Sequence, residues 1–97
     1  MKIIFSKKKL IQILKGQKNL GFVPTMGAIH KAHIYILKKS TSLCNKTIVT
    51  IFVNKPQFNK ITDYKKYPRN LKKDISILRK CKVDYLYLPS TKQIYPF

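Results

Sequence analysis

Two histidines three residues apart, His30 and His33, are the side chains of this 97-residue chain best suited to chemistry. They follow an apolar segment at 20–23 and a turn at Gly27, a residue that can take backbone angles closed to other residues. Apolar residues then recur at helical spacing, which predicts a helix that begins within 29–32. Both imidazoles are therefore expected on one face of the first helical turn.

A strand, a glycine turn and a helix in this order are typical of an anion site. The first N–H groups of a helix lack partners, and the helix dipole places about half a positive charge there. Imidazoles at this point can also donate to phosphate oxygens. Zinc chemistry of the HExxH type is excluded, because Lys31 replaces the glutamate and Ile34 the second histidine. Histidines at this spacing are more often solvated than catalytic, but the setting favours phosphate binding.

Two amides form a second candidate group. The β-branched segment 47–53 predicts a strand buried on both faces, and Asn54 and Gln57 follow it directly. Ligands of open α/β sheets bind at the C-terminal edge of the strands. An amide can donate to a carboxylate and accept from a hydroxyl, although simple turn chemistry also explains Asn54. We expect both amides and both histidines to converge on one cleft.

The chain is predicted to be an α/β protein. Its expected strands lie at 20–23, 47–53 and 83–88; its expected helices lie at 6–16, from the motif to about 40, and at 70–80, with short turns at 63–66 and after Ser90. Pro24 should end the first strand, because it cannot donate to a central ladder. This alternation implies a Rossmann-like parallel sheet of about three strands with flanking helices.

The segment PTMGAIHKAH resembles the nucleotide-binding motif of the pantothenate synthetase (pantoate–β-alanine ligase) family and, more distantly, the HxGH motif of the nucleotidyltransferase superfamily. Further blocks of the same family follow in its order and at matching spacing: TIVTIFVNKPQF (47–58), YPRNLKKD (67–74), KVDYLYLPS (82–90) and IYP (94–96). One such block is a weak signal, whereas five ordered blocks that cover most of the chain are a strong one.

This resemblance implies an ATP-dependent ligase. In the family, the pantoate carboxylate attacks the α-phosphate of ATP, and β-alanine then displaces AMP from the pantoyl adenylate. The resemblance implies that His33, as proton donor, and His30 are the catalytic residues, and that Mg²⁺ accompanies the phosphates. The residues matched to ATP binding are Met26, Gly27, Ala28, Ile29, His30, Lys31, Ala32 and His33. Asn54 and Gln57 match residues that hold pantoate, and Gln57 also matches a position near β-alanine.

The chain departs from the family in three ways. Ala32 stands where the family has glycine, and Lys55 separates Asn54 from the proline that usually follows it. The chain also ends just after IYP. We therefore expect residues 1–97 to form the N-terminal portion of a nucleotide-binding domain, without the family's C-terminal domain and with little turnover alone. An inactive remnant or a small basic module that binds RNA or another polyanion are the alternatives.

The net charge of +18 comes from 21 basic and three acidic residues. Only Arg69 and Arg79 are arginine, the residue preferred for reading bases and for bidentate phosphate contacts, so we expect nucleic acid to bind only nonspecifically. For Arg69 a structural contact is expected. Cys44 and Cys81 have no metal-binding spacing, and no segment approaches the 18 apolar residues of a membrane span. We expect a cytoplasmic protein without a membrane partner, and the resemblance implies a possible homodimer.

Overall fold

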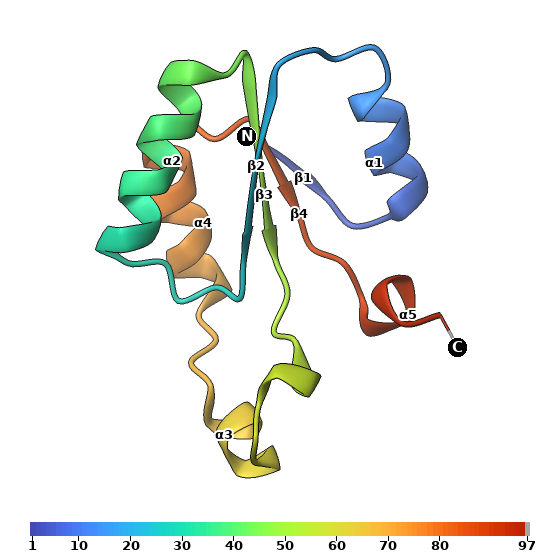
Figure 1. Cartoon of the computed structure of the whole chain (residues 1–97), viewed down its shortest axis with the longest axis vertical. Coiled ribbons are helices and arrows are strands. Elements are labelled where there is room, and N and C mark those ends of the chain that lie inside the picture. Colours follow the sequence, from blue (N-terminus) through green and yellow to red (C-terminus); the bar gives the residue numbers. More distant parts are fainter. Residues whose placement is uncertain (97) are drawn as a thin grey trace.

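Four parallel strands form one sheet in the computed structural model of the chain, which describes residues 1–96 (Figure 1). The strands are β1 (Lys2–Ile4), β2 (Leu20–Thr25), β3 (Lys46–Ile51) and β4 (Tyr85–Tyr87), and their order in the sheet is β1-β4-β3-β2. All three predicted strands are present and parallel. The fourth, β1, was not predicted; it pairs with β4 and forms one edge.

The prediction that Pro24 ends the first strand is wrong. β2 continues to Thr25, with Pro24 opposite Thr50 of β3. The reason is its position: within the described residues β2 pairs only with β3, so it is an edge strand. Proline is tolerated at an edge because the missing N–H can face away from the neighbouring strand. β2 therefore ends two residues later than expected, and the loop begins after Thr25.

The helices are α1 (Lys7–Leu14), α2 (Lys31–Leu43), α3 (Ile61–Lys66), α4 (Leu71–Lys80) and α5 (Thr91–Ile94), with a 3₁₀ turn at Lys55–Gln57. The two predicted N-caps are confirmed: Ser6 Oγ accepts from the Lys9 N–H, and Asn70 Oδ1 accepts from the Lys73 N–H, both at 3.1 Å. Such caps satisfy N–H groups that have no partner inside the helix. Helix α2 runs past the expected end at Ser40.

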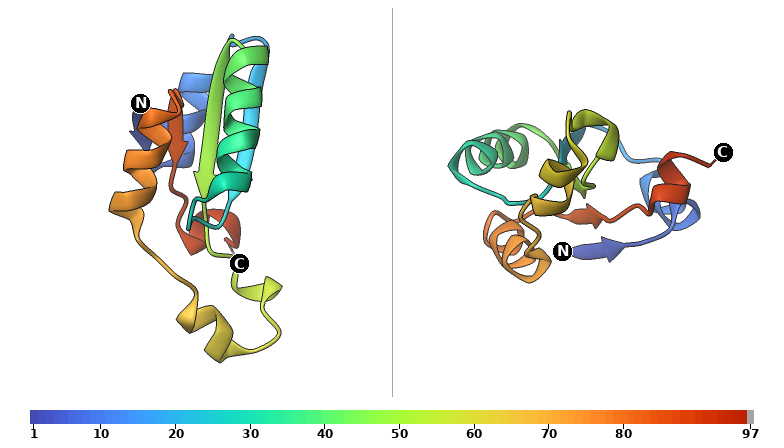
Figure 2. Two further views of the ribbon diagram at one scale, coloured as in Figure 1. Left: turned by 90° about the vertical axis from the view of Figure 1, so that its left-hand side faces the viewer. Right: turned by 90° about the horizontal axis from the view of Figure 1, so that it is seen from below.

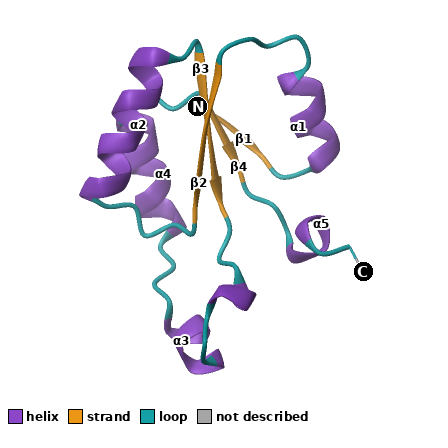
Figure 3. Cartoon of the chain, in the orientation of Figure 1, coloured by secondary structure: helices purple, strands orange, loops and turns teal. Residues whose placement is uncertain are grey.

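Helices cover both faces of the sheet (Figures 1 and 3). On one face α2 and α4 bury the larger core, which includes Val49 and Leu86 of the central strands, Leu37 and Leu78. On the other face α1 packs its leucines on a smaller core of Ile4, Ile48 and Tyr87. No helix within residues 1–96 has both the length and the apolar character needed to cross a membrane.

The segment between β3 and α4 leaves the sheet and carries α3 well clear of it (Figure 2). The guanidinium of Arg69 holds this excursion together, because it donates to the carbonyls of Tyr64 and Tyr67 at 2.9 Å and of Lys65 at 3.4 Å. Its carbon Cζ also lies 4.9 Å from the centre of the Tyr64 ring. The structural role predicted for Arg69 is confirmed.

Candidate functional site

A cleft of about 900 Å³ opens where β2 and β3 end. His30 and His33 line it from the start of α2, and Asn54 and Gln57 line it from the segment after β3. These are the four side chains whose convergence the strand ends predicted, and the structure brings them together. The C-terminal edge of a parallel sheet is where such a fold binds its ligands.

The loop between β2 and α2 takes a conformation that few residues allow. Gly27 and Ala28 both have left-handed backbone angles, with φ of +81° and +53°. A Cβ added to Gly27 would lie 3.1 Å from Asp74 Oδ2 and 3.2 Å from Ile51 Cγ2. Thr25 Oγ1 accepts from the Gly27 N–H at 3.1 Å and tightens the turn. A side chain at position 27 would therefore meet both an unfavourable backbone angle and tight neighbours, which favours glycine here.

Asp74 fixes this loop from the side of α4. It is only 4% exposed, and its two carboxylate oxygens accept from the N–H groups of Ala28 at 3.0 Å and Ile29 at 2.9 Å. No role was predicted for Asp74 from the sequence. The available signal was its spacing, three residues after Leu71 and four before Leu78, which places a carboxylate on the apolar face of the helix. The N–H groups of Ala28 and Ile29, which precede α2, therefore already have an acceptor within the protein.

The two histidines cap α2 with the same ring atom. His30 is the N-cap residue, and its Nδ1 accepts from the Ala32 N–H at 3.2 Å. The Nδ1 of His33 accepts from the His30 N–H, also at 3.2 Å, and the two ring centroids are 4.1 Å apart. A nitrogen that accepts carries no proton, so in each neutral ring the hydrogen is on Nε2. Each ring can therefore offer its Nε2–H to a ligand.

Burial lowers the pKa of His33, the neighbouring His30 lowers it further, and the carboxylate of Asp74 opposes the shift. A half-buried imidazole next to a second imidazole loses solvation and gains repulsion when it is protonated. The lowered pKa favours the neutral ring that the capping contact requires. Geometry and electrostatics thus agree on the protonation state of His33.

Asn54 is oriented by Tyr95, a residue near the C-terminus. The Tyr95 hydroxyl donates to Asn54 Oδ1 at 2.6 Å, and the Tyr95 ring lies 6.5 Å from that of Phe52. This contact orients the amide of Asn54, whose NH₂ group can then donate to a ligand. Lys55, the inserted residue, starts the 3₁₀ turn that carries Gln57.

The eight residues at 26–33 divide into three groups. Met26, His30 and His33 line the cleft. Gly27, Ala28 and Ile29 instead fix the loop, and Ile29 is buried in the core beside α2. The other two, Lys31 and Ala32, do not line the cleft.

The remaining wall of the cleft is mostly apolar. It continues along the face of the sheet that α1 covers, where Leu10, Leu14, Leu20, Phe22 and Ile48 line it. Phe22 of β2 is 61% exposed there. An apolar wall beside a few convergent polar groups is the usual composition of a small-molecule site.

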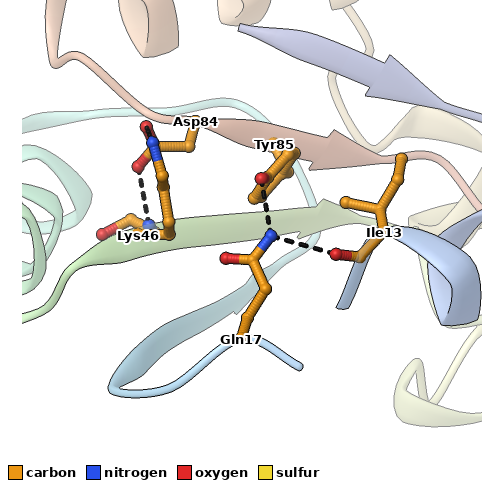
Figure 4. Close-up of polar contacts among 6 residues, drawn as sticks. Ile13, Gln17, Lys46, Asp84 and Tyr85 are labelled. Atoms are coloured by element: carbon orange, nitrogen blue, oxygen red, sulfur yellow. Dashed lines mark hydrogen bonds and ion pairs between the residues drawn. The ribbon is translucent and has the colours of Figure 1, made fainter. Parts of the chain in front are cut away.

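Polar contacts at the opposite end of the sheet are separate from the cleft (Figure 4). Asp84 Oδ2 accepts from the Thr47 N–H at 2.8 Å, and Oδ1 lies 3.7 Å from Lys46 Nζ. Gln17 Nε2 donates to the Tyr85 hydroxyl at 2.7 Å. None of these residues lines the cleft. They hold the fold and provide natural controls for the residues that do.

Comparison with known proteins gives consistent matches. The family model described as Pantoate-beta-alanine ligase matches residues 2–97. A pantothenate synthetase from Pseudothermotoga lettingae is 44% identical over 96 residues, which are 99% of this chain and 34% of the relative. One from Francisella philomiragia is 53% identical over 79 residues, 81% of this chain and 30% of the relative. The chain thus spans about a third of the length of the curated relatives that it matches.

Solved structures match the whole fold. The pantoate-β-alanine ligase of Francisella tularensis, solved in complex with beta-gamma ATP and β-alanine, is 45% identical with a TM-score of 0.94, over 99% of this chain and 38% of that one. The pantothenate synthetase of Thermus thermophilus is 32% identical with a TM-score of 0.91, over 99% and 34% of the two chains.

Proposed function

The chain belongs to the pantoate–β-alanine ligase family, and we propose that its cleft binds ATP and pantoate for the ATP-dependent formation of pantothenate. The observation that carries this proposal is the convergence of His30, His33, Asn54 and Gln57 on one cleft at the C-terminal edge of the sheet. Those are the positions that the family resemblance matched to ATP and pantoate. The activity of the whole ligase is part of the proposal, because the chain spans about a third of its relatives.

In the first proposed step, a carboxylate oxygen of pantoate attacks the α-phosphorus of ATP. The bond to the bridging oxygen breaks, pyrophosphate leaves with the electron pair, and pantoyl adenylate forms. His30 and His33 donate hydrogen bonds from Nε2–H to phosphate oxygens. His33, which the family resemblance matches to the proton donor, keeps its proton in this step and shares it only through that hydrogen bond. Fixed donors aimed at the charge that develops on these oxygens lower the barrier without reorganising during the reaction.

In the second proposed step, the amine of β-alanine attacks the acyl carbon of the adenylate. AMP leaves, the nitrogen loses a proton, and the amide bond of pantothenate is formed. Asn54 and Gln57 hold pantoate through this sequence, and Gln57 also lies near β-alanine. The Asn54 NH₂ group donates to a pantoate oxygen, a role supported by the Tyr95 hydroxyl that already occupies Oδ1. Such positioning supplies much of the rate when little covalent chemistry is asked of the protein.

The segment from Met26 to His33 is proposed to bind ATP in two ways. Met26 and the histidines contact the nucleotide from the wall of the cleft. The residues between them keep the backbone in place, and Lys31 adds positive charge nearby. Ala32, which replaces the family glycine, is proposed to keep the backbone slightly further from the nucleotide.

Magnesium enters this proposal only with the phosphates of ATP. Within the described residues, no three His, Cys, Asp or Glu side chains are grouped to hold a metal, and no carboxylate lines the cleft. We therefore propose no magnesium site made by these residues alone. Mg²⁺ commonly keeps several waters and binds through substrate phosphates, so we propose that it enters the cleft bound to the nucleotide.

We also propose a cellular compartment, an oligomeric state and a mode of nucleic-acid binding for the protein. Cys44 and Cys81 are free thiols, which supports a reducing compartment such as the cytoplasm. A homodimer rests on the family resemblance alone, and sedimentation at several concentrations tests it. Nucleic acid is proposed to bind only through the general charge of +18.

Binding to the intact chain tests the function. Calorimetric titration with Mg–ATP and with pantoate is expected to give saturable binding of each. His33→Ala should weaken Mg–ATP, and Gln57→Ala should weaken pantoate. The matched control is Gln12→Ala, because Gln12 is an exposed glutamine of α1 outside the cleft.

Salt separates binding in the cleft from attraction by net charge. Raising the salt from about 0.1 M to about 1 M shortens the Debye length from about 10 Å to about 3 Å, which removes most nonspecific attraction. If Mg–ATP no longer binds at high salt, and if His33→Ala leaves its affinity at low salt unchanged, the result would favour the polyanion-binding alternative instead.

A further inference from the structure

Asp74 is the most buried of the three acidic residues, at 4% exposed, whereas Asp63 is exposed and the Asp84 side chain is 31% exposed. Within the described residues the one ion pair joins Lys46 and Asp84, so Asp74 has no cationic partner there. A buried carboxylate is costly unless hydrogen bonds replace its water. The Ala28 and Ile29 N–H groups, at 3.0 and 2.9 Å, supply that replacement.

The two N–H groups belong to consecutive residues and face the same carboxylate. Left-handed angles at Gly27 and Ala28 turn the backbone so that both point one way. Successive N–H groups arranged like this form a concave site for an anion. In this chain the anion is the protein's own side chain, which reaches the loop from α4, 45 residues away in sequence.

We propose that Asp74 is a positioning residue of the nucleotide site: its carboxylate fills the anion nest of the loop, so that the nucleotide meets the imidazoles of His30 and His33 instead of the loop backbone. This inference rests on the proposed function. The nest ends at Ile29 and His30 is the next residue, the N-cap of α2. Holding Ile29 in place therefore sets where the first ring stands, and the His30 N–H in turn holds the second ring at Nδ1.

A carboxylate is the side chain this contact needs. Both oxygens accept, and a carboxylate has acceptors only. Asparagine would keep one acceptor and would turn an NH₂ group toward the other backbone N–H. The longer glutamate would enter a space so tight that even a Cβ on Gly27 would lie 3.1 Å from Oδ2.

The test compares Asp74→Asn with Asp84→Asn in the full chain. Asp84 is the matched control, because its carboxylate also accepts from a backbone N–H, that of Thr47, but at the opposite end of β3 (Figure 4). Two quantities are measured: Mg–ATP affinity by calorimetry, and the proton contacts between the rings of His30 and His33 by NMR. Asp74→Asn should weaken Mg–ATP about tenfold or more, because one buried N–H loses its partner, and should remove the ring contacts. Asp84→Asn should preserve both.

Each outcome decides the proposal. Ring contacts and affinity that survive Asp74→Asn would overturn it, and so would equal losses in Asp84→Asn, which would indicate a general effect on stability. If the unaltered chain binds no Mg–ATP, the proposed function fails, but the ring contacts still decide whether Asp74 positions the histidines. If Asp74→Asn does not fold, Asp74→Ser replaces it, since serine adds no donor amide against the loop.

Discussion

Replacing Gly27 by alanine should destabilise the chain more than the same change at Gly16, and the difference measures how tightly the loop is packed. Both glycines have left-handed backbones, with φ of +81° and +78°. Alanine in that conformation costs about 1–2 kcal/mol. A Cβ at Gly16 meets nothing within 4 Å, so the conformational cost is all that Gly16→Ala should show.

At Gly27 the new methyl also meets Asp74 Oδ2 at 3.1 Å and Ile51 Cγ2 at 3.2 Å. Neither neighbour can retreat freely, because the carboxylate is bound to two N–H groups and Ile51 belongs to β3. Overpacking of a well-filled site costs about 1–3 kcal/mol. The free energy of unfolding should therefore fall by about 2–5 kcal/mol in Gly27→Ala.

The assay is denaturant unfolding of both variants and the unaltered chain, analysed by linear extrapolation. In a domain of this size each kcal/mol also lowers the melting temperature by about 4–8 °C, which gives an independent check. Equal losses in Gly16→Ala and Gly27→Ala would refute the reasoning. They would mean that the loop yields to a methyl and that Asp74 does not hold it rigidly.

Three further predictions concern the cleft. The pKa of His33 is lowered on folding, so the folded chain binds fewer protons than the unfolded chain. The contribution of His33 to the free energy of unfolding should be fully present above about pH 6.5 and should be lost as the pH falls through the lowered pKa. His33→Gln should flatten this pH dependence in unfolding curves. Tyr95→Phe frees the amide of Asn54 and should weaken pantoate binding about 2–10-fold in calorimetry, whereas Tyr85→Phe, outside the cleft, should not. Ala32→Gly should tighten Mg–ATP binding and lower the free energy of unfolding by about 0.5–1 kcal/mol; equal affinities would show that the methyl does not oppose the nucleotide.

The parallel sheet could be predicted because its signals are local. Segments 20–23 and 47–53 are apolar runs of strand length, and the helices between strands carry a 3.6-residue period with recognisable caps at Ser6 and Asn70. β1 has no such signal. Its three residues pair with β4 more than 80 positions later, so only the assembled sheet makes them a strand. For the same reason the edge position that admits Pro24 could not be inferred from residues near it.

The same difference between local signals and distant contacts applies to the candidate site. The histidines and the amides each lie just past the end of a predicted strand, and parallel topology brings such positions to one edge, so their convergence was predictable. Asp74 was not. Its spacing from Leu71 and Leu78 puts it on the inward face of α4, but neither spacing nor composition tells that its carboxylate meets a loop 45 residues earlier. The orientation of Asn54 depends in the same way on Tyr95, 41 residues later.

The capping contacts explain how two histidines can serve folding and ligand binding together. Each ring uses Nδ1 for a backbone N–H at the start of α2, and that bond fixes the hydrogen on Nε2. Protonation of His33 would convert its Nδ1 to a donor facing the His30 N–H, so this contact opposes the charged form of His33. A charged imidazole would attract phosphate more strongly, but it would open the turn that holds it. The arrangement therefore favours a neutral His33 that keeps its hydrogen on Nε2. In the proposed nucleotide site, positive charge beside the phosphates would then come from residues such as Lys31 that take no part in the cap.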